Sequence, residues 1–313
     1  MSEGAEIRFD GRVAVVTGAG RGLGREFAKL LASRGAAVVV NDIGTPADAD
    51  RYADRDGDVA YRVAEGIAAG GGEAVANRAD VADPAGAASV VADAVTGFGR
   101  VDIVINNAGI VVDGALADAT PEALRAAWGV HVGGAFNVLS AAWPHLAAQR
   151  YGRIVNVGSI AGLLVGIAGH LPYEVAKGGL AGMTRALATE GEPLGIAVNA
   201  LLPTADTRSA GSVPRGYDRG ARFEARHVAP VAAWLAHEDC RVNGRFFAAG
   251  AGRVGEVFTS AAAGYQCARP AEFSLENIRA NWEVVTSPAA AVTPASIGDY
   301  NAFRMAIYEA AVS

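Results

Sequence analysis

Thr17-Gly18-Ala19-Gly20-Arg21-Gly22-Leu23-Gly24 is the stretch that decides the fold, and it directly follows the apolar residues 13–16. A strand that runs through a glycine-rich turn into a helix forms a phosphate site, because backbone amides face the anion and no side chains block its approach. We therefore predict a dinucleotide-binding turn, with Gly18, Gly22 and Gly24 spaced Gly-x-x-x-Gly-x-Gly. A purely structural turn is the alternative, since the chain has 40 glycines among 313 residues.

Asp42 ends a second apolar run, residues 36–40, and supports the dinucleotide interpretation. An acidic side chain at this point of a nucleotide-binding unit accepts hydrogen bonds from the adenosine ribose hydroxyls and repels a 2′-phosphate. We therefore predict NAD rather than NADP as the cofactor. Arg21 is the contrary indication, since an arginine there could pair with a 2′-phosphate, and a turn or helix-capping role is the alternative for Asp42.

The composition favours a single α/β domain that acts on a small molecule. Apolar residues make up 51% of the chain, which is enough to bury one large core. The net charge of −6 and the pI of about 5.4 argue against nucleic acid or an anionic membrane as the main partner.

Asp54, Asp56, Asp58 and Glu65 match positions of a calcium loop, but Val59 stands where that loop needs glycine, so we expect no metal.

The two cysteines, Cys240 and Cys267, favour a reducing cytoplasm over a disulfide scaffold. Residues 1–11 are polar and acidic, without the basic and apolar regions of a secretory signal. The longest nearly apolar stretch, residues 160–168, is too short to span a bilayer. We therefore expect a cytoplasmic protein that is not embedded in a membrane.

Apolar strand candidates alternate with helix-length segments through the first 250 residues. This order predicts a single Rossmann-like, doubly wound parallel sheet of about seven strands with helices on both faces. We assign residues 1–250 to this cofactor-binding and catalytic domain, and residues 251–313 to a C-terminal extension that packs on the same domain or on a partner subunit. The strand candidates are residues 13–17, 36–41, 73–77, 101–105, 153–158, 196–200 and 245–249.

Tyr173 and Lys177 are four residues apart, which places a phenol and an ammonium on one face of a helix. Because a nearby ammonium favours the phenolate, we expect the lysine to lower the tyrosine pKa and to prepare Tyr173 for acid–base chemistry. Ser159 stands at the end of the preceding strand, where its hydroxyl can bind the substrate oxygen that Tyr173 protonates or deprotonates. An exposed helical pair is the alternative for the two residues.

Together these motifs resemble the short-chain dehydrogenase/reductase family over about residues 10–250. The resemblance implies that Tyr173 is the general acid or base, that Lys177 holds the nicotinamide ribose, and that Ser159 orients the carbonyl. It also implies that Asp80 and Val81 line the adenine pocket, and that residues 106–109 form the turn that supports the sheet beside the cofactor. The implied cofactor-binding residues are Thr17, Gly18, Gly20, Arg21, Gly22, Leu23, Gly24, Asp42, Asp80, Val81, Asn107, Ala108, Gly109, Tyr173, Lys177, Pro203 and Thr204.

Three features depart from the common family pattern. The interval between Ser159 and Tyr173 is one residue longer than usual. His131 stands where many members have an asparagine that feeds a proton-relay water, so it is either a catalytic replacement in that relay or a buried histidine bonded to the backbone. Thr204 replaces the glycine that often follows Pro203, and we expect it to contact the nicotinamide carboxamide differently.

Asp42, His131 and the long extension narrow the resemblance to the (3R)-hydroxyacyl-CoA dehydrogenase portion of peroxisomal multifunctional enzyme type 2, also called 17β-hydroxysteroid dehydrogenase type 4, and its stand-alone bacterial relatives. This implies an NAD-dependent (3R)-hydroxyacyl-CoA dehydrogenase. The alternatives are a 17β-hydroxysteroid or steroid-CoA dehydrogenase, a pathway-specific ketoreductase and, outside the enzymes, a nucleotide-binding sensor without turnover. A sensor would not depend on Tyr173.

Two further expectations concern partners. The segment 203–227 contains Arg208, Arg215, Arg219, Arg222 and Arg226, and these either meet the phosphates of coenzyme A or form a solvated, charge-balanced lid. Small residues near 176–182 permit close helix approach, and family members commonly pair the helices near residues 122–148 and 172–189 across an interface. We therefore expect a homodimer or homotetramer.

Overall fold

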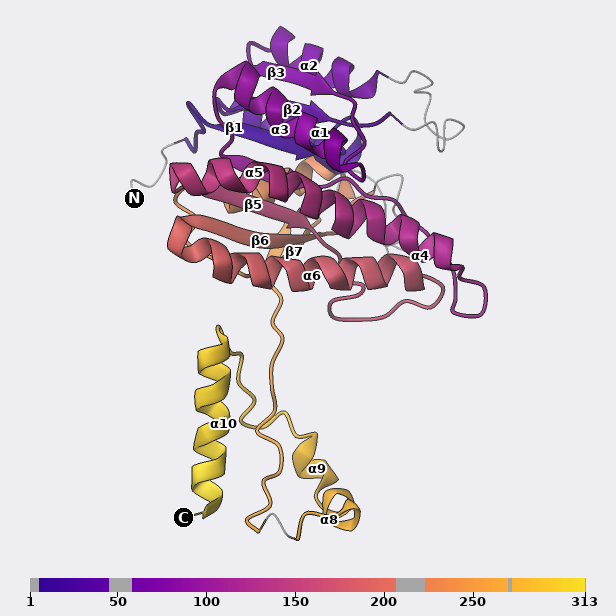
Figure 1. Cartoon of the computed structure of the whole chain (residues 1–313), viewed down its shortest axis with the longest axis vertical. Helices are drawn as coiled ribbons and strands as arrows, with labels where there is room; N and C mark the ends of the chain where they lie inside the picture. Colours follow the sequence, from indigo (N-terminus) through magenta and orange to yellow (C-terminus); the bar gives the residue numbers. More distant parts are fainter. Residues whose placement is uncertain (1–5, 45–57, 207–222, 270–271, 313) are drawn as a thin grey trace. The chain divides into compact units, whose positions relative to one another are not determined.

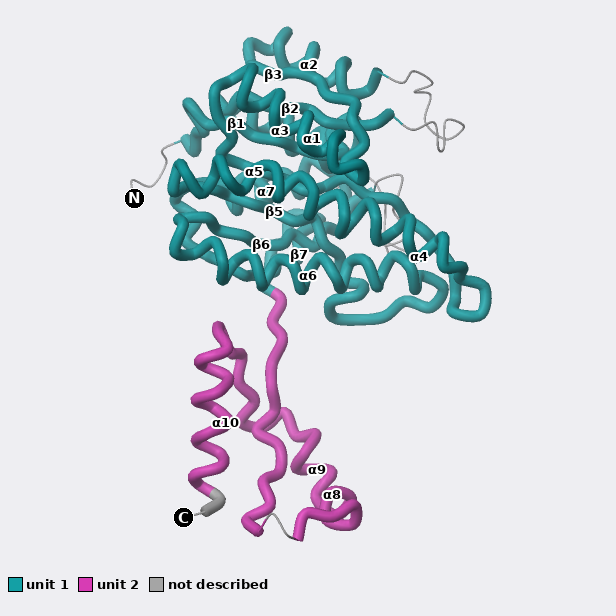
Figure 2. The backbone as a smooth tube through the Cα atoms, viewed as in Figure 1, with its two compact units in different colours: residues 1–256 teal, residues 257–313 magenta. Residues whose placement is uncertain are grey.

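The computed structural model describes residues 6–44, 58–206, 223–269 and 272–312. The chain forms two compact units, Met1–Glu256 and Val257–Ser313, coloured separately in Figure 2. The first unit contains the sheet and every predicted site residue. The described helices include none that is both long and apolar enough to cross a bilayer.

The first unit is built on one eight-stranded sheet in the order β3-β2-β1-β4-β5-β6-β7-β8 (Figure 1). The pairings from β1 to β7 are parallel, and β8 pairs antiparallel with β7. The strands are β1 Val13–Thr17, β2 Ala37–Asn41, β3 Glu73–Asn77, β4 Ile103–Asn106, β5 Gly152–Val157, β6 Ile196–Pro203, β7 Phe246–Gly250 and β8 Arg253–Glu256. The predicted Rossmann-like parallel sheet is confirmed, and its seven strands lie where the sequence placed them.

The eighth strand was not predicted. β8 is only four residues long, lacks a buried residue and follows a turn in which both Ala251 and Gly252 have positive φ. An exposed edge strand with this composition has no apolar run that would reveal it. Because β8 pairs with β7, the first unit continues to Glu256.

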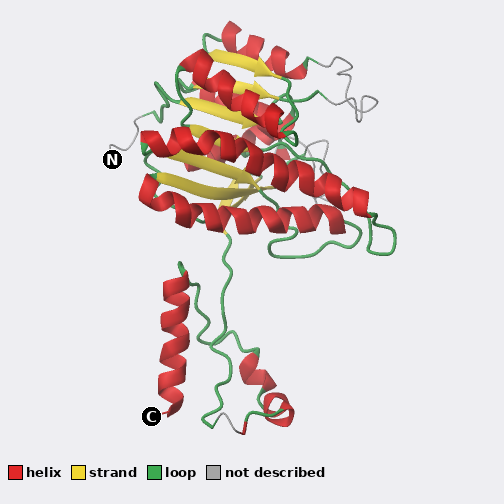
Figure 3. Cartoon of the chain, in the orientation of Figure 1, coloured by secondary structure: helices red, strands yellow, loops and turns green. Residues whose placement is uncertain are grey.

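Helices cover both faces of the sheet, as Figure 3 shows. One apolar core joins Val16 of β1 to α1, α2 and α7, and a second joins Val15 to α3, α5 and the C-terminal part of α6. Neighbouring residues of a strand point to opposite faces, so this continuously apolar strand belongs to both cores. The helices of this unit are α1 Gly22–Ser33, α2 Val59–Ala69, α3 Pro84–Phe98, α4 Pro121–Trp128, α5 Ala135–Gln149, α6 Leu171–Gly191 and α7 Ala229–Ala236, with 3-10 turns η2 Glu192–Leu194 and η4 Ala225–His227.

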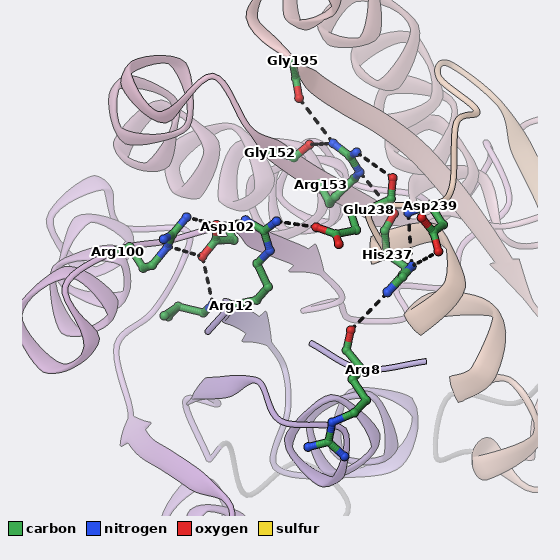
Figure 4. A network of polar contacts seen from close by, with 11 residues as sticks. Arg8, Arg12, Arg100, Asp102, Gly152, Arg153, Gly195, His237, Glu238 and Asp239 are labelled. Carbon is green, nitrogen blue, oxygen red and sulfur yellow. Dashed lines mark hydrogen bonds and ion pairs between the residues drawn. The ribbon is translucent and has the colours of Figure 1, made fainter. Parts of the chain in front are cut away.

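A polar network holds the amino-terminal edge of the sheet (Figure 4). The carboxylate of Asp102 is fully buried and accepts hydrogen bonds from the Val13 amide at 3.0 Å, from Arg100 at 2.6 and 2.7 Å, and from Arg12 at 3.2 Å. Arg153 is also buried. Its guanidinium donates hydrogen bonds to the backbone carbonyl oxygens of Gly152, Gly195, His237 and Glu238. A cavity of about 380 Å³ opens beside these residues, at the edge opposite the one where parallel sheets bind ligands.

The second unit has almost no core of its own. It contains α8 Leu275–Ala280, α9 Trp282–Val285 and α10 Ile297–Val312. Among its described residues with a burial class, only Cys267 is buried, while large apolar side chains are exposed. A segment this small that leaves its apolar side chains in water cannot bury enough surface to be stable alone. The exposed set includes Phe258, Phe273, Leu275, Trp282, Val284, Ile297 and Met305.

Candidate active site

The glycine-rich turn connects β1 to α1 and leaves a helix N-terminus accessible to an anion. Gly18 and Gly22 have φ values of +62° and +52°, which residues with a Cβ rarely adopt. Arg21, the residue before α1, makes no side-chain cap, and the first turn contains no acidic residue. The first amides of a helix have no intrahelical acceptor, so those of α1 remain for a phosphate.

Close packing also requires glycine at three positions of this turn, because a Cβ atom there would meet neighbouring atoms. A Cβ on Gly24 would collide with the Gly18 carbonyl oxygen, and one on Gly18 would lie 2.8 Å from the Ala108 Cα atom. A Cβ on Gly20 would lie 2.9 Å from Oδ2 of Asp42 and would also collide with Val59. The turn therefore fits a dinucleotide, because its backbone approaches its neighbours, and would approach a pyrophosphate, without a side chain between them.

Thr17 and Asn107 join this turn to the end of β4. The Thr17 hydroxyl accepts hydrogen bonds from the amides of Asn107 and Ala108, both at 3.0 Å. In return, the Asn107 side-chain amide donates to the carbonyl groups of Thr17 at 2.9 Å and Gly18 at 3.0 Å. β1 and β4 are neighbours at the point where the strand order reverses, which is where doubly wound sheets bind ligands.

Asp42 lies directly after β2, beside the glycine-rich turn. Its Oδ2 accepts the Gly20 amide at 3.0 Å, and its Oδ1 accepts the Gly44 amide at 2.9 Å. These two bonds orient a half-exposed carboxylate whose remaining lone pairs can accept ribose hydroxyls. The same negative charge would oppose a 2′-phosphate.

Asp80 and Val81 follow β3 at the same edge of the sheet. Asp80 accepts the Ala82 amide at 2.8 Å, and Val81 is 5% exposed. The side-chain amide of Asn137, on α5, donates to the Val81 carbonyl oxygen at 3.1 Å. These contacts fix a buried apolar side chain after β3, and its place in an adenine pocket stays a prediction.

Ser159, Tyr173 and Lys177 come together at the end of β5. Ser159 follows this strand, and the other two lie on the first turns of α6. The Lys177 ammonium donates to the Val157 carbonyl oxygen at 2.6 Å and lies 5.6 Å from the centre of the Tyr173 ring. A hydrogen bond with Ser159 favours the ionised form of Tyr173. The structure therefore brings the predicted acid–base residues together.

The predicted effect of the lysine on the tyrosine is wrong in this structure. Burial raises the pKa of Tyr173, and the Ser159 hydrogen bond offsets this only in part. Burial also lowers the pKa of Lys177 from its ordinary 10.5 to about 7. The lysine is therefore only partly charged near neutral pH, and it interacts with a backbone carbonyl at 2.6 Å. Loss of hydration therefore outweighs the Ser159 hydrogen bond at Tyr173 and favours the neutral form of Lys177.

His131 lies in η1 Gly129–Gly134, a π-helical turn between α4 and α5. Its ring is 4% exposed and stands edge-on to the Tyr173 ring, with 5.5 Å between centres and 82° between planes. Nε2 is 2.7 Å from the Ile110 carbonyl oxygen, whereas Nδ1 is buried without a hydrogen-bond partner. Burial, and then the charge of Lys177, lower the pKa of His131 to about 3. Sequence reasoning missed both the π-helical turn and Ile110.

Two loops meet beside the acid–base residues. Gly114 donates to the Gly169 carbonyl oxygen at 2.7 Å, and Asp113 pairs with His170 at 2.8 Å. Sequence reasoning missed this pair as well, because neither residue belongs to a recognisable motif. The loops and the start of α6 expose apolar side chains, which suit an apolar substrate better than a sugar or nucleic acid. These side chains are Ile110, Val111, Leu164, Val165, Ile167, Leu171 and Val175.

Pro203 and Thr204 lie at the end of β6, at the same edge of the sheet. The Thr204 amide donates to the Ala249 carbonyl oxygen at 2.8 Å, so its backbone continues the pairing of β6 with β7. Arg226 pairs with Glu224 at 2.8 Å. The other arginines of the segment 203–227 lie outside the described residues, as do residues 45–57 of the acidic insertion. The contact of Thr204 with the nicotinamide stays a prediction.

Comparison with known proteins now identifies the family. A family described as short chain dehydrogenase matches residues 12–214. The chain belongs to the short-chain dehydrogenase/reductase family. It is therefore an oxidoreductase that acts on CH–OH groups with a nicotinamide cofactor, and its small-molecule chemistry agrees with the composition.

Several members of the family are similar over most of this chain. Peroxisomal multifunctional enzyme type 2 of Drosophila melanogaster is 41% identical over 252 residues, which are 80% of this chain and 41% of that enzyme. A short-chain type dehydrogenase/reductase of Mycobacterium tuberculosis is 40% identical over 277 residues, 88% of this chain and 94% of that protein. Versicolorin reductase 1 of Aspergillus parasiticus is 39% identical over 230 residues, 73% of this chain and 83% of that protein.

Solved structures give the same result. The full-length multifunctional enzyme type 2 from Drosophila melanogaster matches with a TM-score of 0.80 and 32% identity, covering 97% of this chain and 50% of that one. A short-chain dehydrogenase from Mycobacterium avium matches with a TM-score of 0.76 and 35% identity, covering 92% and 98%. This chain thus spans half or less of the multifunctional enzymes type 2 and nearly the full length of the mycobacterial proteins.

Proposed function

We propose that the protein is an NAD-dependent dehydrogenase of (3R)-hydroxyacyl-CoA esters. The observation that carries this proposal is the placement of Ser159, Tyr173 and Lys177 at the same sheet edge as the glycine-rich turn and Asp42. One end of the site suits a dinucleotide, and the other contains a hydroxyl, a phenol and an amine of adjustable charge. This set of groups suits proton transfer coupled to hydride transfer at a secondary alcohol.

In the oxidative direction, Tyr173 accepts the proton of the substrate hydroxyl, and Ser159 donates a hydrogen bond that holds the same oxygen. Lys177 helps to hold the cofactor ribose and favours the phenolate when it is charged. The nicotinamide, when bound, accepts the hydride that leaves the carbinol carbon. In the reductive direction the phenol returns its proton to the carbonyl oxygen. The raised pKa of Tyr173 makes the protein alone a better proton donor than acceptor near neutral pH.

Asp42 supports NAD as the cofactor. Its carboxylate is fixed by Gly20 and Gly44 at the end of β2, which leaves a negative charge close to the turn. A ribose diol would gain hydrogen bonds from this group, whereas a 2′-phosphate would be repelled. Arg21 is the contrary indication in the sequence, and the NAD-to-NADP comparison described below tests it.

The substrate class rests on two supports. Similar proteins include peroxisomal multifunctional enzymes type 2 and the hydratase-dehydrogenase-epimerase of Neurospora crassa, which is 36% identical over 282 residues. In addition, apolar side chains from the loops near residues 110–111 and 164–171 lie beside the acid–base residues and suit an acyl chain. The arginines of segment 203–227 provide groups for the phosphates of coenzyme A.

A pathway-specific ketoreductase is the second candidate, supported by the similarity to versicolorin reductase 1. A 17β-hydroxysteroid or steroid-CoA ester would also suit the apolar loops. Measuring NADH formation with (3R)-hydroxyacyl-CoA esters of several lengths, 17β-hydroxysteroids and polycyclic alcohols, each with NAD and with NADP, separates these candidates. Turnover of the CoA esters with NAD supports the proposal. Turnover of polycyclic alcohols alone supports the ketoreductase.

Tyr173→Phe separates an enzyme from a nucleotide sensor. The substitution removes the hydroxyl and keeps the ring that packs on His131, so we expect NADH to bind within about threefold of its normal affinity. Turnover should fall by at least about 100-fold, because the proton-transfer group is lost. Turnover that persists in Tyr173→Phe would contradict the assigned role, whereas a sensor would show no turnover in either protein.

The assembly and location also remain proposals. We expect a homodimer or homotetramer, supported by Trp128 and Phe136, which expose large apolar surface on α4 and α5. We also expect the C-terminal extension to pack on its own catalytic domain or on a partner subunit, because its own apolar side chains lack a core. A cytoplasmic location is supported by Cys240 and Cys267, which are both free thiols.

A further inference from the structure

His131 contacts two parts of the site, the turn beside the cofactor position and the catalytic helix. Its Nε2 lies 2.7 Å from the carbonyl oxygen of Ile110, which ends the turn beside the cofactor position. Its ring also packs edge-on against Tyr173, with 5.5 Å between ring centres. At its start, the same turn is fixed to β1 by two hydrogen bonds that Asn107 donates to Thr17. The histidine therefore lies between the nucleotide turn and the catalytic helix.

The geometry defines which ring nitrogen carries hydrogen. A carbonyl oxygen only accepts hydrogen bonds, so a ring nitrogen at 2.7 Å from it must be the donor; otherwise two lone pairs would face each other. Nε2 is therefore protonated, although the Ile110 amide also lies 3.3 Å away. In a neutral ring this leaves Nδ1 as an acceptor, and the burial that lowers the pKa of His131 to about 3 keeps the ring neutral.

The backbone on both sides of the His131 ring leaves room for it and fixes its position. Three glycines of η1, Gly129, Gly133 and Gly134, surround the histidine in the sequence, and π-helical turns of this kind often occur at functional sites. Gly109 permits the contact from the other side, because a Cβ there would lie 3.0 Å from Nδ1 and would collide with Cε1. Both elements are therefore shaped around this ring.

We infer that His131 is a positioning residue that holds Ile110 through its Nε2–H and thereby fixes the turn 107–110 against Tyr173. This inference rests on the proposed dehydrogenase function and assigns the histidine a role other than proton transfer. Loss of the bond to Ile110 would release one end of the turn that lies beside the nicotinamide position. Misplacement of reacting groups by about 1 Å can reduce turnover by about 100-fold.

Glutamine and asparagine at position 131 distinguish a role of Nε2 from a role of Nδ1. The side-chain nitrogen of glutamine reaches about as far from the backbone as Nε2, whereas that of asparagine reaches about as far as Nδ1. We expect His131→Gln to retain the donor to Ile110 and to keep kcat and the NADH dissociation constant within about threefold of wild type. His131→Asn and His131→Ala should lower kcat by about 10- to 100-fold. Turnover retained by asparagine but not by glutamine, or by all three variants, would overturn the inference.

A second measurement does not require substrate. Nitrogen NMR shifts of the His131 ring in the purified protein should show a neutral ring with hydrogen on Nε2 from about pH 5 to about pH 9, despite Lys177 and Tyr173 nearby. Hydrogen on Nδ1, or titration of the ring near neutral pH, would overturn the inference. Urea unfolding of each variant identifies those that fail to fold. If wild type oxidised no hydroxyacyl-CoA, the proposed substrate would fail, while the NMR result and NADH titrations would still test His131.

Discussion

Replacing Lys177 with methionine should abolish turnover and stabilise the protein near neutral pH. Burial lowers the pKa of this lysine from 10.5 to about 7. This difference corresponds to about 5 kcal/mol of unfavourable free energy at a pH below 7, at about 1.4 kcal/mol per pH unit. Methionine has no charge to desolvate but leaves the Val157 carbonyl oxygen without its donor, which costs about 1–3 kcal/mol. We therefore expect a net stabilisation of about 2–4 kcal/mol at pH 6.5.

The pH dependence isolates the lysine from the lost hydrogen bond. Between pH 7 and 10.5 the unfolded chain keeps the Lys177 proton and the folded protein does not, so the unfolded state binds more protons. The stability of wild type therefore increases with pH in this window, falls as pH decreases from about 10.5 toward about 7, and no longer changes through this lysine below about pH 7. Relative to Lys177→Met, the free energy of unfolding of wild type should rise by about 1.4 kcal/mol per pH unit between about pH 7.5 and about pH 9.5.

Urea unfolding at a series of pH values, without cofactor, measures this difference. The chain has only two lysines, and the other, Lys29, is exposed on α1. Lys29→Met is therefore the matched control, and its difference from wild type should stay flat within about 0.5 kcal/mol. If the Lys177→Met difference were equally flat, the lysine would be charged at little cost in the folded protein. The argument that burial controls its charge would then be refuted.

Two further predictions concern the cofactor turn and the opposite edge of the sheet. Asp42→Asn keeps the shape of the side chain but removes its charge, so the ratio of kcat/KM with NAD to that with NADP should fall at least about tenfold; an unchanged ratio would exclude Asp42 as the selective group. Asp102→Asn places an amide among the guanidinium groups of Arg12 and Arg100, and should lower the free energy of unfolding in urea by about 2–3 kcal/mol. Glu238→Gln, on an exposed partner of Arg12, should cost less than about 1 kcal/mol, and equal losses would show that burial does not set the difference.

The parallel sheet could be predicted because its strands are buried on both faces. Residues 13–16 and 36–40 are uninterrupted apolar runs, and the glycines between them leave few ways to connect strand and helix. The placement of Ser159, Tyr173 and Lys177 at one edge of the sheet could also be predicted. A strand end determines the position of Ser159, and a helical spacing of four residues determines that of the other two. Local pattern was sufficient wherever the backbone geometry is regular.

The remaining features depend on contacts that no local pattern contains. The π-helical turn around His131 adds one residue per turn to an otherwise regular helix, and its partner Ile110 is an ordinary apolar residue. The direction of the Tyr173 pKa depends on how much water the fold excludes, which helical spacing does not reveal. β8 and the pair of Asp113 with His170 likewise arise from tertiary contacts.

The two edges of the sheet treat buried polar groups in opposite ways. At the amino-terminal edge, Asp102 has several donors and Arg153 has several carbonyl acceptors. At the carboxyl edge, His131 Nδ1 and Asn106 Oδ1 are buried without a partner in the described structure, and Lys177 is buried with one carbonyl.

A buried amine that is costly to charge is best explained by chemistry that uses it, which is the role proposed for Lys177, whereas the unpartnered Nδ1 follows from the orientation of His131 toward Ile110. A satisfied amino-terminal edge offsets that cost within the same sheet. Substitutions that satisfy groups at the carboxyl edge should therefore increase stability and reduce turnover, whereas substitutions at the amino-terminal edge should reduce stability and leave kcat nearly unchanged.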